Sequence, residues 1–205
     1  MIRAGHRKFF VIFFDFYTKW MLRRHFQRIN IYTSPDETDK PVIMIGNHFS
    51  WWDGFIANYI NLELFRRKIH IMMLEEQLRG RMFLNKAGAF SIRKNSRSAI
   101  ESLDYTVGLL ENRDHLVVLY PQGEFQSVYS SRIGFQPGIM RVLKGLRKPV
   151  QMVFYAALTD YFSSFRPHLS IYLETVDPDD LQDIKALENA YNDFYNACKE
   201  KQMKE

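Results

Sequence analysis

Residues 41–53 read PVIMIGNHFSWWD, a stretch in which an apolar run is followed by a group of polar and aromatic residues. Its first five residues (41–45) are apolar and predict a buried strand, while residues 54–64 have the pattern of a helix. The polar residues between them, including His48 and Asp53, therefore follow the end of a strand. In open sheets of mostly parallel strands, functional loops lie at the carboxyl ends of the strands. The stretch predicts a strand, a functional loop and a helix.

The same alternation continues through the rest of the chain. Strands are expected at residues 41–45, 68–74, 89–92, 115–120, 150–158 and 169–173. Helices are expected at residues 54–64, 75–85, 97–111, 137–146 and 181–203. Such alternation is typical of an α/β fold, a single domain with a mixed, largely parallel sheet flanked by helices. We expect this domain over residues 34–205, after an N-terminal amphipathic helical arm over residues 1–33 that ends at the polar segment SPDETDK.

The His48–Asp53 spacing has a chemical use. A hydroxyl is a poor nucleophile at neutral pH, and a neutral imidazole can take its proton as it attacks a carbonyl carbon. A carboxylate on the other ring nitrogen fixes the tautomer and stabilises the imidazolium that forms. We expect His48 to be a general base that Asp53 orients. The alternative is that Ser50 or Asp53 only caps the next helix, with His48 an ordinary loop residue.

The pattern Asn47-His48-x-Ser50-x-x-Asp53 resembles the first motif of the glycerolipid acyltransferases, the lysophosphatidic acid acyltransferase-like superfamily. The resemblance implies transfer of a fatty acyl group from acyl-CoA or acyl-carrier protein to a lipid hydroxyl, with no metal and no other cofactor. It implies that His48 and Asp53 are catalytic, and that Asn47 and Ser50 belong to the substrate-binding site.

A second segment, GAFSIRK at residues 88–94, resembles the family's next motif. That motif has a Gly, an apolar run and an Arg that binds the acceptor. Lys94 stands where the Arg is expected, and Arg93 precedes it by one residue. Either side chain can bind an anion, although Lys lacks the bidentate geometry of Arg. The resemblance therefore implies that Arg93 and Lys94 are binding residues, the alternative being an ordinary basic strand end.

The third motif, usually Phe-Pro-Glu-Gly-Thr-Arg in the family, reads YPQGEF at residues 120–125. The Pro and the Gly are kept, whereas Phe125 stands in place of the Arg. The expected binding residues are Pro121, Gln122, Gly123 and Glu124. Arg132, in the same loop, is a candidate to replace the missing Arg, and backbone N–H groups near Gly123 are candidates to stabilise an oxyanion. The departures concern acceptor recognition, so a lysolipid, an aminolipid and a glycolipid all stay open as acceptors.

The N-terminal 28 residues combine an aromatic stripe with basic flanks. Phe9, Phe13, Phe16 and Trp20 recur at helical spacing, and six Arg or Lys residues surround them. The uninterrupted apolar run is much shorter than the about 20 residues of a spanning helix, and no small-residue cleavage site follows it. The pattern favours a helix lying in a membrane interface, with peripheral association at the cytoplasmic face, over a core helix with basic ends.

Composition narrows the classes of protein. The formal net charge of +5 suits any anionic partner. No nucleic-acid-binding signature is present, and no Gly-x-Ser-x-Gly motif of a serine hydrolase. Cys198 is the single cysteine, which excludes an internal disulfide and favours a reducing compartment. The expected partners are a membrane lipid surface and acyl-CoA or acyl-carrier protein, with no nucleic acid. A non-catalytic lipid-binding relative stays open.

Overall fold

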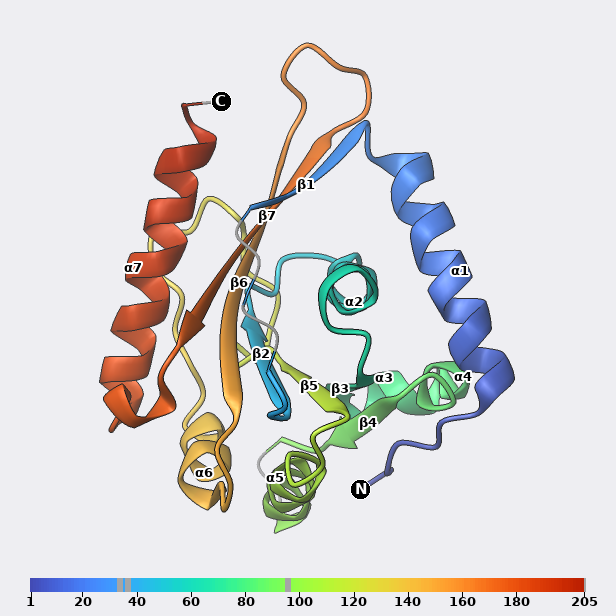
Figure 1. The fold of residues 1–205 in the computed structure, drawn as a ribbon, viewed down its shortest axis with the longest axis vertical. Helices are drawn as coiled ribbons and strands as arrows, with labels where there is room; N and C mark the ends of the chain where they lie inside the picture. The colour runs from blue at the N-terminus through green and yellow to red at the C-terminus, as the bar shows by residue number, and fades with distance from the viewer. Residues whose placement is uncertain (33–34, 36–37, 95–96, 205) are drawn as a thin grey trace.

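The structure is a computed structural model that describes residues 1–32, 35, 38–94 and 97–204. The expected boundary between arm and domain, at residues 33 and 34, lies outside the described residues, so that division stays a prediction. Within the described part the chain forms a seven-stranded sheet of order β1-β7-β6-β2-β5-β3-β4 (Figure 1). The strands are β1 (Arg28–Tyr32), β2 (Val42–Gly46), β3 (Lys68–Leu74), β4 (Ala89–Ile92), β5 (His115–Leu119), β6 (Gln151–Asp160) and β7 (His168–Val176).

The direction of the strands determines where the loops meet. Strands β6 and β7 pair antiparallel, and the other neighbouring pairs are parallel. The predicted mixed, largely parallel sheet is therefore confirmed. Strands β2 to β6 all run in one direction, so the loops that follow β2, β4, β5 and β6 meet at one edge of the sheet. These loops contain the three family-like segments.

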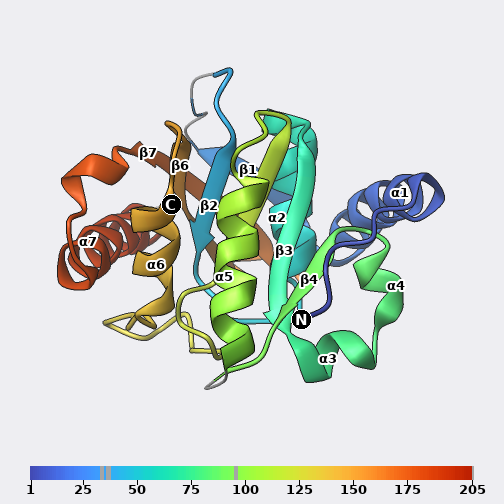
Figure 2. The same ribbon diagram turned by 90° about the horizontal axis from the view of Figure 1, so that it is seen from below.

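Helices cover both faces of the sheet (Figures 1 and 2). They are α1 (Lys8–His25), α2 (Asp53–Ile60), α3 (Glu75–Arg79), α4 (Met82–Asn85), α5 (Arg97–Leu109), α6 (Gly138–Gly145) and α7 (Ile184–Gln202). Helices α1 and α2 pack on one face, where Leu22 and Ile56 meet strand residues such as Met44. Helices α5, α6 and α7 cover the other face, where Val142 and Leu187 belong to the second core. A π-helical turn (Asn61–Phe65) extends α2, and a 3₁₀ turn (Pro178–Asp180) precedes α7.

Two features differ from the predicted elements. The helix expected over residues 75–85 is interrupted after Arg79, because Gly80 ends α3 and Arg81 lies outside helical backbone angles. Strand β1 was not predicted and falls within the residues expected to form the helical arm. It pairs with β7, about 140 residues away in sequence, through the register Arg28 with His168. Local sequence patterns do not report such a distant partner.

The carboxyl end of β2 has no room for a side chain. A Cβ on Gly46 would lie 2.1 Å from Cζ and 2.6 Å from Oη of Tyr155, the residue paired with it on β6. The Tyr155 ring is fully buried, and its hydroxyl donates to that of Tyr120 at 2.8 Å. Gly46 therefore makes space for a tyrosine that reaches toward the loop after β2.

We predict that Gly46→Ala lowers the free energy of unfolding by about 1–3 kcal/mol, because the added methyl group displaces a buried, hydrogen-bonded ring. Thermal or urea unfolding measures the change. The matched control is Gly108→Ala in α5, where an added Cβ meets nothing within 4 Å. That variant should be unchanged or up to about 1 kcal/mol more stable, because Ala favours a helix over Gly. If both variants were as stable as the unmodified protein, a close contact between residue 46 and the Tyr155 ring would be excluded.

Candidate active site

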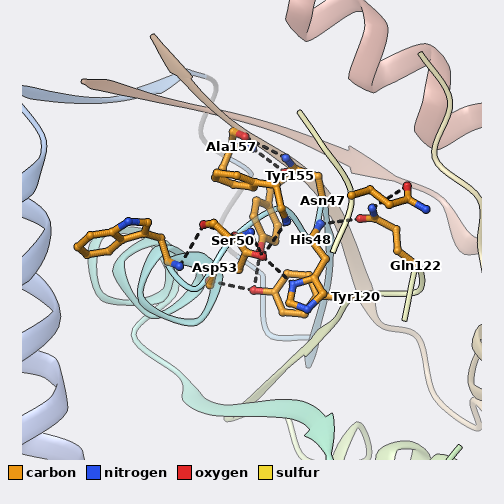
Figure 3. Close-up of polar contacts among 11 residues, drawn as sticks. Asn47, His48, Ser50, Asp53, Tyr120, Gln122, Tyr155 and Ala157 are labelled. Carbon is orange, nitrogen blue, oxygen red and sulfur yellow. Dashed lines mark hydrogen bonds and ion pairs between the residues drawn. The ribbon is translucent and has the colours of Figure 1, made fainter. Parts of the chain in front are cut away.

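Asp53 organises the loop between β2 and α2 (Figure 3). Its buried carboxylate, at the first residue of α2, accepts hydrogen bonds from the backbone N–H groups of Phe49 (2.9 Å) and Ser50 (3.1 Å) through Oδ2. The Ser50 hydroxyl donates to Oδ1 at 3.2 Å and accepts from the N–H of Trp52 at 3.1 Å. Hydrogen bonds to both of its oxygens fix the orientation of this carboxylate. Ser50 thus acts on the loop through Asp53 and the start of α2.

His48 lies directly against this carboxylate. Its Nδ1 is 2.6 Å from Oδ2 of Asp53. An ionised carboxylate only accepts hydrogen bonds, so Nδ1 is the donor, and in the neutral imidazole Nε2 then keeps its lone pair. Within the described residues Nε2 makes no hydrogen bond, and the side chain is 25% exposed. The ring nitrogen that a general base needs is therefore accessible from outside.

Two aromatic rings hold the imidazole from its sides. The ring centroid of Tyr120 lies 4.6 Å from that of His48 with an interplanar angle of 23°, and that of Phe125 lies 4.2 Å away at 36°. Both residues come from the third family-like segment, at the end of β5 and in the loop after it. Contacts with aromatic rings limit the orientations that the imidazole can take. Phe125 therefore contacts the expected base directly, at the position where the family has an Arg.

Two hydrogen-bonded tyrosine hydroxyls connect β6 and the end of β5 to the start of α2. The Tyr155 hydroxyl donates to that of Tyr120 at 2.8 Å, and Tyr120 donates to the backbone carbonyl of Asp53 at 2.9 Å. Burial raises the pKa of Tyr120 and of Tyr155 well above the ordinary value of a phenol. Both hydroxyls therefore stay protonated and act as donors. Strands β5 and β6 thereby fix the start of α2.

The structure places Asn47 and Gln122 beneath the loop. The buried amide of Asn47 donates to the carbonyl of Ala157 on β6 at 2.9 Å and accepts from its N–H at 2.8 Å. The buried amide of Gln122 accepts from the N–H of His48 at 2.5 Å and donates to Oε1 of Gln126 at 3.0 Å. Gln126 in turn donates its N–H to the carbonyl of His48 at 2.9 Å. Gln122 thus contacts the backbone of His48, whereas Asn47 joins the residue before His48 to strand β6.

The second and third segments meet at Gly123. The exposed ammonium group of Lys94, just beyond β4, donates to the Gly123 carbonyl. The N–H of Gly123 donates to the carbonyl of Tyr120 at 3.1 Å, so it is not free to stabilise an oxyanion. The next two amides, of the exposed residues Glu124 and Phe125, have no hydrogen-bond partner among the described residues. These two N–H groups are therefore the candidates in this loop to stabilise an oxyanion. Pro121 is buried and accepts from Gln136 through its carbonyl at 2.8 Å.

The other two basic candidates are held by carboxylates. Arg93 lies 2.7 Å from Oε1 of the buried Glu75, which Arg79 also contacts at 2.9 Å. Hydrogen bonds from Arg79 and Arg93 lower the pKa of Glu75 to about 2. Arg132 pairs with Glu188 of α7 at 3.0 Å. The structure thus brings Lys94 to the loop of the third segment, whereas Arg93 and Arg132 are engaged elsewhere.

Three residues of the site were not expected from the sequence. Tyr120 and Phe125 stand in the third segment, but only the structure shows that both rings contact His48. Tyr155 lies in an apolar strand with no polar neighbour to mark it. Its position opposite Gly46 could have identified Tyr155, but that pairing is known only once the register of β2 with β6 is known.

The fold and the site together define an α/β enzyme-like domain with a His–Asp pair at the carboxyl edge of its sheet. A family model described as Acyltransferase matches residues 24–156, and the chain therefore belongs to the acyltransferase family. The crystal structure of the 1-acyl-sn-glycerophosphate (LPA) acyltransferase PlsC from Thermotoga maritima has a similar fold, with a TM-score of 0.68. The two sequences are 13% identical, and the match covers 94% of this chain and 79% of that one. A search of curated proteins found no match.

We predict that Gln122→Leu lowers kcat on the order of 10–100-fold, because the N–H of His48 loses its acceptor and the imidazole shifts. Gln122→Glu keeps an acceptor oxygen at the same place and should retain most of the activity. Steady-state rates with one donor and one acceptor measure the difference, with circular dichroism confirming the fold of both variants. Equal rates for the two variants would show that Gln122 does not position His48.

Proposed function

We propose that this acyltransferase family member moves a fatty acyl group from acyl-CoA or acyl-carrier protein to a hydroxyl of a lysolipid or glycerolipid-type acceptor at a membrane surface. The observation that carries the proposal is the 2.6 Å contact between His48 Nδ1 and Asp53 Oδ2, which leaves Nε2 accessible. A lipid-binding protein without activity has no need of a buried carboxylate that orients a partly exposed imidazole.

The proposed reaction needs no covalent enzyme intermediate. The acceptor hydroxyl approaches Nε2 of His48 and loses its proton as its oxygen bonds to the thioester carbonyl carbon. Asp53 stabilises the imidazolium, and the free N–H groups of Glu124 and Phe125 are proposed to bind the oxyanion. The carbon–sulfur bond then breaks, and the imidazolium returns the proton to the departing thiolate. The products are an ester and a free thiol, and His48 is restored.

Exposed aromatic side chains support a membrane location for this reaction. Helix α1 exposes Phe9 and Phe16 at 74% and 70%, together with other apolar side chains of the predicted stripe. None of the described helices is both long and apolar enough to cross a membrane. We propose that α1 lies in the interface, where such a stripe buries its apolar area and its basic flanks meet anionic headgroups.

The same surface leads toward His48. Trp51 is exposed, and its ring centroid lies 4.8 Å from that of Phe55. Phe55 lies 5.9 Å from Tyr17 of α1. An aromatic surface thus connects the helix proposed to rest on lipid with the loop that holds the base. We propose that lipid substrates reach His48 from this side.

A specific observation favours an acceptor without a phosphate group. Phe125 contacts His48 at the position where the family has an Arg, and Arg93 is paired with Glu75. Lys94 is the cation that reaches the third segment. One exposed ammonium group is a weaker phosphate site than an Arg pair, because it lacks bidentate geometry. An aminolipid or a glycolipid is therefore the second candidate for the acceptor.

We predict that His48→Ala abolishes turnover and that Asp53→Asn lowers kcat on the order of 10³–10⁴-fold, since the imidazole loses its tautomer and its counter-charge. Mass spectrometry of the lipids formed is the measurement, with palmitoyl-CoA or palmitoyl-carrier protein and a panel of lysolipids, aminolipids and glycolipids. A new acylated lipid should appear only when His48 is intact. Acyl transfer at an undiminished rate by His48→Ala would exclude this mechanism.

We predict that Phe125→Arg lowers the KM for phosphate-bearing lysolipids about tenfold, because a hydrogen bond to a charged group contributes about 1.5–3 kcal/mol. The KM for a neutral acceptor should not fall. Phe125→Leu is the matched control, since it keeps an apolar cover without adding charge. If both variants changed the two KM values alike, the Phe125 position would not determine acceptor choice.

A further inference from the structure

The hairpin between β6 and β7, residues 161–167, has three exposed aromatic side chains that the proposed mechanism does not use. Tyr161 and Phe162 are 61% and 50% exposed, and Phe165 is fully exposed. Phe162 also has a φ of +45°, in the left-handed region that residues other than Gly rarely adopt. Strained backbone of this kind concentrates at functional sites. Packing within the fold does not account for these aromatic side chains, because they are exposed to solvent.

The hairpin lies at the edge of the sheet that carries His48. It follows the carboxyl end of β6, which is parallel to β2. Gly46, the last residue of β2, pairs with Tyr155, and β6 continues for five more residues to Asp160. At about 3.3 Å per residue, β6 ends roughly 17 Å beyond the end of β2, and the hairpin begins there. It therefore projects past the catalytic loop, as Figure 1 shows at the top of the molecule.

Hydrogen bonds fasten the hairpin to the carboxyl end of α1. Arg166 donates to the backbone carbonyls of Arg23 (3.3 Å) and Arg24 (3.1 Å) and to Oε1 of Gln27 (2.7 Å). The N–H of Gln27 donates to the carbonyl of Pro167 at 2.8 Å. Ser164 further closes the turn through its 3.1 Å contact with His168. The hairpin and the aromatic helix are thus parts of one surface.

The charges beside the hairpin match an anionic lipid surface. Residues 161–168 read YFSSFRPH and contain no acidic side chain. The side chains of Arg23, Arg24 and Arg166 are exposed at the junction with α1. Aromatic rings with basic neighbours are the composition of segments that bind at the interface of anionic bilayers. A protein partner would find few hydrogen-bonding groups at the tip to give it specificity.

We infer that the β6–β7 hairpin is a second membrane contact, which inserts Phe162 and Phe165 into the bilayer interface beside α1. The inference rests on the proposed function, because it assumes that the edge of the sheet with His48 faces lipid. Two contacts, one at the helix and one at the hairpin, would hold the catalytic edge toward the surface that contains the acceptor.

The test is flotation of the full chain with vesicles of phosphatidylcholine and phosphatidylglycerol, which requires no catalysis. The double variant Phe162→Ser/Phe165→Ser should bind these vesicles about tenfold or more weakly, since two aromatic side chains no longer enter the interface. Ile100→Ser is the matched control, because Ile100 is exposed on α5, on the opposite face of the sheet. It should bind like the unmodified protein. Binding by the double variant equal to that of the control would overturn the inference.

A second measurement keeps the test independent of folding. Cys198, the single cysteine, is buried, so Phe165→Cys can be labelled selectively with an environment-sensitive dye. Addition of the vesicles should raise the dye's fluorescence and shift its emission to the blue, whereas Ile100→Cys should show little change. The inference would be overturned if the dye at position 165 showed no change with vesicles that bind the protein. It would also be overturned if the change arose from self-association without vesicles. Vesicle binding through the hairpin without any acylated product would refute only the proposed function.

Discussion

The buried carboxylate of Asp53 accepts hydrogen bonds from His48 Nδ1, from two backbone N–H groups and from the Ser50 hydroxyl. The loop after β2 takes its shape from these bonds, and the bond to Nδ1 orients the His48 ring. Removing a buried carboxylate of this kind would leave several donors unsatisfied, at about 1–3 kcal/mol each. The residue that supports the proposed chemistry is therefore also the residue that shapes the loop.

Residues of the sheet hold the loop of His48 and Asp53 in place. Asn47 ties the loop to the backbone of Ala157, and Tyr155 reaches Tyr120 across the space that Gly46 leaves free. Gln122 holds the backbone of His48 from the neighbouring loop. Asn47 and Gln122, expected from the sequence as binding residues, thus also connect the loop of His48 to β6 and to the loop after β5. Gln122 and Phe125, two positions at which the third segment departs from the family motif, both contact His48.

Much of the fold and the contact between His48 and Asp53 could be predicted because the signals are local. Strands β3 and β4 have the predicted bounds, and His48 meets Asp53 as the five-residue spacing implied. Strand β1 was missed because it forms only by pairing with β7. The contact of Phe125 with His48 was missed because it depends on how the loops after β2 and β5 approach each other. Burial of the Gln122 amide likewise depends on tertiary packing rather than on the motif.

We propose that Asp53 keeps the proton of neutral His48 on Nδ1 and leaves Nε2 free to act as a base. The most direct test is ¹⁵N NMR of the protein labelled at histidine, at neutral pH, with His48 assigned by comparison with His48→Ala. We expect a protonated Nδ1 and an unprotonated Nε2, with this distinction lost in Asp53→Asn. A neutral His48 with its proton on Nε2 in the unmodified protein would show that Asp53 does not set the tautomer.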